Sequence, residues 1–147
     1  MSLDVDVAAD QVRTPVSRAR VAALARATLR AEGVRHALVS ITFVTRRRIA
    51  TLNEQHLGHR GATDIISFGF TRTTGDSPVI GDVYVAPEIA RENARERGVG
   101  VREEIVRLVV HGILHVLGHD HPSGEDREGS PMWRRQERLV RRLANAS

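Results

Sequence analysis

The amino-acid sequence predicts a single α+β domain, spanning residues 1–147, in which helices pack on a small mixed β-sheet. Two observations support this prediction. The length of 147 residues is typical of one domain with a sizeable core. The hydrophobic pattern changes between strand-like alternation and helix-like periodicity in the order βαβαββααα, with no internal repeat and no interdomain linker.

The N-terminal half predicts two strands, each followed by a helix. Residues 3–7 alternate apolar side chains with aspartate, and residues 36–44 alternate again, as half-exposed strands do. A helix is expected over residues 15–32, with Thr14 as its cap and proline at its first position. Thr45 is expected to cap the second helix, which opens with three arginines. The buried stripe of the first helix should consist of Val21, Leu24, Ala25 and Leu29.

The C-terminal half predicts two strands, over residues 65–70 and 79–85, and then three helices. The first helix covers residues 87–97, opened by proline and ended by glycine. The second begins at about Val101 and contains the longest apolar run of the chain, so we expect it to be buried. The last helix begins at Pro131. Its inward face should carry Met132, Leu139, Val140 and Leu143, with most of its arginines outward.

The charge balance favours an anionic partner without requiring one. All 22 basic residues are arginine, which binds phosphate in a bidentate way, and the formal net charge is +4. The run Arg46–Arg48 opposes the dipole of its helix; it either faces solvent or contacts phosphate, and the sequence leaves both interpretations open. With one tryptophan, one tyrosine and three phenylalanines, binding dominated by base stacking is not expected.

The absence of cysteine excludes a disulfide framework and a thiolate metal site. No apolar run reaches the length of a membrane span, and no apolar segment follows the first residue. From these features we expect a cytoplasmic protein without a membrane partner.

Four of the seven histidines lie within the segment 111–121. His111 and His115 are one helical turn apart on the same face, where their rings can converge on one ion. Gly118 can end the helix and reverse the chain, which would return His121 as a third ligand. A lone histidine on an apolar helix is usually a hydrogen-bonded core residue, but three in this arrangement favour a metal. The pattern predicts one zinc ion per chain, at the end of the buried helix, with the fourth position open to water.

Such a zinc site would lower the pKa of its water to about 7 and generate a hydroxide nucleophile. Zinc proteases of the His-Glu-x-x-His type place a glutamate directly after the first histidine, where this chain has Gly112, so a protease is disfavoured. Asp120 is either a turn residue or a group that orients a ligand or accepts a proton. His119 also has two possible roles: it lies either outside the ring of metal ligands or on the side that faces the substrate.

The segment His111–His121, HGILHVLGHDH, resembles the signature H-G-x-L-H-L-x-G-Y-D-H of the YbeY family of bacterial ribosomal RNA maturation factors. His119 stands where the family has tyrosine. Residues 63–68 resemble the family's T-D-V-L-S-F strand and residues 81–83 its G-D-I strand, in matching order. The resemblance covers the chain from about Ser40 to the C-terminus.

The resemblance implies a metal-dependent endoribonuclease that is specific for single strands. It would act in ribosomal RNA maturation, at the 3′ end of the small-subunit RNA, and in ribosome quality control. The expected partners are single-stranded or ribosomal RNA and the small ribosomal subunit or one of its proteins. By the motif, His111, His115 and His121 carry over as zinc ligands.

One departure from the family concerns the loop before the T-D-V strand. Many relatives have an arginine there in a Y-R-x-K-D context, and this chain has Leu57 at that position. His59 and Arg60 are the candidates to replace it, and with Asp120 they form the set of candidate catalytic residues. Two alternatives remain open: a zinc hydrolase of another substrate such as a peptide, and a non-catalytic ribosome-biogenesis factor whose metal is structural.

Overall fold

The computed structural model describes the chain except for residues 59, 71–75, 121–127 and 145–147. The described elements follow one another in the predicted order. They are β1 (Ser2–Ala9), α1 (Arg18–Ala31), β2 (His36–Phe43), α2 (Arg46–Leu57), β3 (Ile65–Phe70), β4 (Val79–Val85), α3 (Pro87–Arg97), α4 (Val101–Val116) and α5 (Pro131–Ala144). The predicted α+β class is confirmed.

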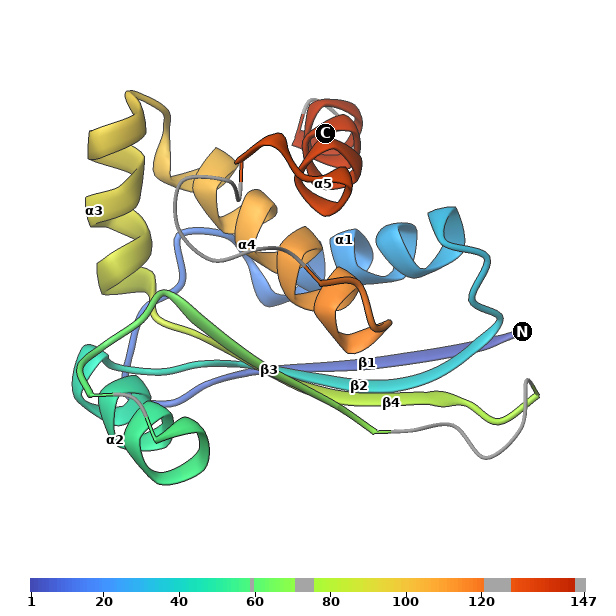
Figure 1. Ribbon diagram of the computed structural model, residues 1–147, viewed down its shortest axis with the longest axis horizontal. Coiled ribbons are helices and arrows are strands. Elements are labelled where there is room, and N and C mark those ends of the chain that lie inside the picture. Colours follow the sequence, from blue (N-terminus) through green and yellow to red (C-terminus); the bar gives the residue numbers. More distant parts are fainter. Residues whose placement is uncertain (59, 71–75, 121–127, 145–147) are drawn as a thin grey trace.

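The four strands form one mixed sheet in the order β1-β2-β4-β3. β1, β2 and β4 run parallel, and β3 pairs antiparallel with β4 at the edge. Helices α1 and α4 cover one face of the sheet, α3 stands beside α4 at one end of it, α5 packs on the outer side of α4, and α2 lies on the opposite side of the sheet (Figure 1). The apolar helix α4 is therefore enclosed between the sheet and α5. None of the described helices is long and apolar enough to cross a membrane.

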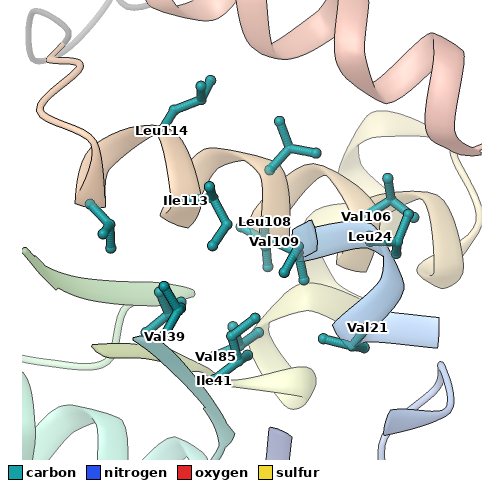
Figure 2. Close-up of a cluster of buried hydrophobic side chains, with 14 of the residues drawn as sticks. Val21, Leu24, Val39, Ile41, Val85, Val106, Leu108, Val109, Ile113 and Leu114 are labelled. Atoms are coloured by element: carbon teal, nitrogen blue, oxygen red, sulfur yellow. The ribbon is translucent and has the colours of Figure 1, made fainter. Parts of the chain in front are cut away.

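Helix α4 forms the centre of the hydrophobic core. Ile113 and Val109 are fully buried, and Figure 2 shows them directed toward the sheet side chains of β2 and β4. Leu24 of α1 packs into the same cluster. The predicted stripe of α1 is buried at all of its positions, as is most of the predicted inward face of α5. Only Leu143 of that face is half-buried.

The start of α1 differs from the prediction. The helix begins at Arg18, and its cap is Ser17, whose side chain accepts a hydrogen bond of 3.1 Å from the backbone N–H of Arg20. The predicted cap, Thr14, lies outside the helix. Val16 is buried in the core, which anchors the chain just before the helix, so the later hydroxyl residue takes the capping position.

The end of α4 lies very close to the sheet because glycines face it. A Cβ atom at Gly69 of β3 would lie 2.6 Å from the backbone oxygen of Val116, and one at Gly81 of β4 would lie 2.5 Å from the Val116 side chain. A Cβ atom at Gly112 would lie 2.8 Å from the side chain of Val83. The glycine after the first histidine of the motif is thus required by helix-sheet packing, and its position faces the sheet.

We expect Gly69→Ala to lower the free energy of unfolding by about 1–3 kcal/mol, because the added methyl group must displace the backbone at the end of α4. Urea unfolding followed by circular dichroism measures this loss. Gly129→Ala is the matched control, since a Cβ atom there has no neighbour within 4 Å. Equal stability of the two variants would contradict the close approach.

Candidate metal centre

The C-terminal half of α4 brings His111 and His115 together. Their ring centroids lie 4.5 Å apart, with an angle of 74° between the ring planes. His111 is buried, with 5% of its surface exposed, and His115 is half-buried. Helix α4 ends at Val116, and Gly118 follows with a φ of 96°, as the predicted glycine reversal requires. Helical spacing alone therefore produces the predicted pair of imidazoles.

A groove of about 310 Å³ adjoins His115. It lies where the end of α4 meets the edge strand β3 and the start of β4. Its lining consists of Gly69, Phe70, Val79, His115, Val116, Leu117 and Gly118. A larger hollow of about 440 Å³ lies along β1, β2 and β4, but none of its described lining residues is a histidine. Because the predicted metal ligands are histidines, the smaller groove is the candidate substrate site.

The buried ring of His111 has a specific partner on α5. Its Nδ1 atom lies 2.6 Å from Oε1 of Gln136, a side chain that is completely buried. The amide nitrogen of Gln136 donates a hydrogen bond of 3.0 Å to Oε2 of Glu137. Neither residue was predicted to belong to the site. The available signal was a glutamine at a position where the apolar stripe of α5 requires an aliphatic residue.

An ionic cluster supports this pair. Arg107 of α4 donates two hydrogen bonds to Glu137, each of 3.0 Å, and one of 2.9 Å to the buried Glu104. Arg107 also pairs with Glu103, one turn earlier on the same helix, at 3.3 Å. Burial opposes the charge of Arg107, but the hydrogen bonds that it donates to Glu137 and Glu104 outweigh this effect and raise the pKa of the guanidinium. Burial likewise opposes ionisation of Glu137, and the bonds from Arg107 and Gln136 lower the pKa of its carboxyl.

The donor set fits a zinc ion as far as the described residues extend. Two imidazoles one turn apart, one of them held at Nδ1 by an amide oxygen, are typical zinc ligands with their outer support. The predicted third ligand, His121, lies outside the described residues. Within the described part of the chain, no group of three histidine or carboxylate side chains is arranged to hold a metal.

The other predicted site residues are dispersed. His119 contacts Glu32 at the end of α1, with 2.8 Å between Nε2 and Oε1, and the same carboxylate binds Arg135 of α5. His119 thus joins the turn after α4 to α1. Asp120 is exposed next to it. Arg60 is exposed in the loop between α2 and β3 and does not line the groove, and His59 lies outside the described residues.

The Arg46–Arg48 run lies at the other end of the sheet. Helix α2 follows the carboxyl end of β2, whereas the groove includes Val79 at the amino end of β4, which pairs with Ala37 at the amino end of β2. Arg46 pairs with Glu92 of α3. The run therefore does not border the groove. Leu57, at the family's arginine position, ends α2 with 46% of its surface exposed.

The chain is similar in sequence to known proteins of one family. The model of the family described as "Endoribonuclease YbeY" matches residues 5–144. An Endoribonuclease YbeY of Bacillus licheniformis is 35% identical, over 97% of this chain and 96% of its own. One from Frankia alni is 34% identical, over 92% of this chain and 80% of its own. A solution structure of a protein from Thermotoga maritima shares the fold, with a TM-score of 0.61 and 24% identity over 95% of this chain and 88% of its own.

Proposed function

Because the chain belongs to the Endoribonuclease YbeY family, we propose that it is a zinc-dependent endoribonuclease that cleaves single-stranded RNA. The observation that supports this most directly is the pair of imidazoles from His111 and His115 beside an open groove at the end of α4. The proposed ligands are His111, His115 and His121, with one zinc ion per chain.

In this proposal the protein residues hold the ion, orient its ligands and leave a groove open to the substrate. His111 is fixed by Gln136 inside the core, and His115 stands at the border between the core and the groove. Zinc, when bound, supplies a Lewis acid that activates water near neutral pH. Gly112 faces the sheet, so the position that carries the general base in zinc proteases is closed to that role here. A proton acceptor must come from elsewhere, and Asp120, two residues beyond the glycine reversal, is the candidate.

The lining of the groove bears on the substrate. Apart from His115, none of its described lining residues has an ionisable side chain, so no carboxylate there repels a phosphate group and no arginine there binds one. The phosphate contacts must therefore come from around the groove, and Arg60 and His59 remain the candidates. We propose ribosomal RNA as the substrate, at the 3′ end of the small-subunit RNA in the cytoplasm and in ribosome quality control, with the small subunit or one of its proteins presenting the strand.

The zinc assignment predicts about one zinc per chain in the purified protein. His111→Ala, His115→Ala and His121→Ala should each lose most of the metal, because a zinc site with two protein ligands binds far more weakly. His119→Ala should retain it, since His119 contacts Glu32. Metal analysis by plasma mass spectrometry measures the content. Full zinc in any of the three variants would remove that residue from the ligand set.

The function itself is tested with a labelled single-stranded RNA, a duplex of the same sequence and the purified protein, with and without chelator. We expect cleavage of the single strand alone, abolished by chelation and restored by zinc. Analysis of the product ends then identifies the bond that is broken. Cleavage that survives confirmed metal removal would contradict a zinc enzyme. Binding without cleavage, free and on the small subunit, would favour a non-catalytic factor.

A further inference from the structure

Gln136 occupies a position that folding alone would assign to an aliphatic residue. It lies in the buried stripe of α5 with Met132, Leu139 and Val140, and none of its surface is exposed. Burying an amide costs free energy unless each of its polar atoms has a partner. Both atoms of this amide have one: the oxygen faces His111, and the nitrogen faces Glu137.

The order of these contacts determines which way the amide points. An ionised carboxylate can only accept hydrogen bonds, so the group of Gln136 that faces Glu137 must be its NH₂ group. Glu137 is held in the ionised form by the two hydrogen bonds from Arg107. The amide oxygen is therefore left to face His111, and it can only accept. Hence Nδ1 of His111 must carry the proton.

A neutral imidazole with its proton on Nδ1 has its lone pair on Nε2, the atom available for a metal. We propose that Gln136 is a positioning residue for His111: it selects the Nδ1-protonated tautomer and fixes the ring so that Nε2 is presented to the ion. Successive hydrogen bonds from Arg107 through Glu137 and Gln136 to His111 thus connect the ionic cluster to the proposed metal centre. Nothing in the apolar packing of α4 against α5 would select a tautomer.

This inference rests on the proposed metal site, but its first test does not require metal. In full-length protein labelled with ¹⁵N in histidine, the ring nitrogens of His111 report their protonation directly, with assignment by comparison with His111→Asn. We expect a protonated Nδ1 and an unprotonated Nε2 after chelation, and the same tautomer with Nε2 shifted by the metal in the zinc-loaded protein. A proton on Nε2 in the chelated wild type would overturn the proposal.

The second test uses Gln136→Met, which keeps the length of the side chain and removes its acceptor. We expect the chelated variant to show both tautomers of His111, and its zinc affinity to fall about 10- to 100-fold in competition with a chromophoric chelator. Gln55→Met, at an exposed position of α2, is the matched control and should leave both measurements unchanged. An unchanged tautomer together with unchanged zinc affinity in Gln136→Met would overturn the proposal.

The two tests separate this proposal from the proposed function. If the wild-type protein shows the Nδ1-protonated tautomer and binds zinc but cleaves no RNA, the enzyme assignment fails and the role of Gln136 stands. If the protein cleaves RNA and Gln136→Met loses neither zinc affinity nor tautomer selection, the enzyme assignment stands and the role of Gln136 fails.

Discussion

Replacement of His115 by alanine should abolish RNA cleavage and leave RNA binding nearly intact. Of the two proposed ligands on α4, His115 borders the groove, while His111 lies deeper between α4 and α5. Loss of the ligand removes the ion and with it the stabilisation of charge that the ion gives the transition state. If that stabilisation is worth about 4 kcal/mol, the rate falls on the order of 10³-fold.

The fold should tolerate this change. His115 is half-buried at the last turn of α4, and alanine is a better helix former than histidine. The measurement is a time course of cleavage of a ribosomal precursor RNA, free and on the small subunit, with binding of the same RNA followed by fluorescence anisotropy. A loss of cleavage with a binding constant within about threefold of wild type is the expected pair of results, because the proposed phosphate contacts come from residues around the groove that this change leaves in place.

His36→Ala is the matched control, since His36 is exposed at the start of β2 and remote from the groove lining. It should cleave at the wild-type rate. Maturation of the RNA by His115→Ala as fast as by wild type would remove the metal centre from the reaction. The binding-factor interpretation would then replace the enzyme, and the zinc would be structural.

The fold was predictable because its elements are amphipathic over short distances. Alternation in β2, helical periodicity in α1 and α4, and glycine or proline at the helix ends are all local signals. The start of α1 was missed because Thr14-Pro15 and Ser17 are both acceptable caps locally. The choice between them is made by Val16, whose burial in the core depends on the rest of the chain.

The pairing of His111 and His115 was predictable for the same reason. His111 and His115 converge because a helix places positions four apart on one face. Gln136 is 25 positions from its partner, and no periodicity links the two. The location of Arg46–Arg48 likewise depended on strand order: only the pairing of β4 between β2 and β3 shows that the run and the groove lie at opposite ends of the sheet. Pairs remote in sequence are determined by topology, which local patterns do not contain.

The largest expected effect on stability is that of Arg107→Ala. The side chain of Arg107 is only 10% exposed, and it is the cation between Glu104, 1% exposed, and Glu137, 22% exposed. Removing it leaves two carboxylates close together inside the protein without their principal partner. Truncating one partner of a buried ion pair typically costs about 3–5 kcal/mol, because the remaining charge is uncompensated. We expect a loss of this size in urea unfolding at neutral pH, with chelator present so that metal binding does not contribute.

The loss of unfolding free energy in Arg107→Ala should become smaller at acid pH, because the cluster stabilises the protein through an ionised Glu137. In the wild type the pKa of Glu137 is lowered, so its contribution to stability is present above about pH 4.3, the ordinary glutamate value, and is lost as the pH falls through the folded-state pKa. Without Arg107 that contribution is absent at every pH, and the carboxylates can take up protons instead. The difference in unfolding free energy between wild type and variant should therefore be largest near pH 7 and shrink below about pH 4.

Arg102→Ala, at an exposed position of the same helix, is the matched control and should change the free energy of unfolding by less than about 0.5 kcal/mol at every pH. A small loss in Arg107→Ala, or one that stays constant from pH 7 down to about pH 3, would show that the cluster does not hold Glu137 ionised.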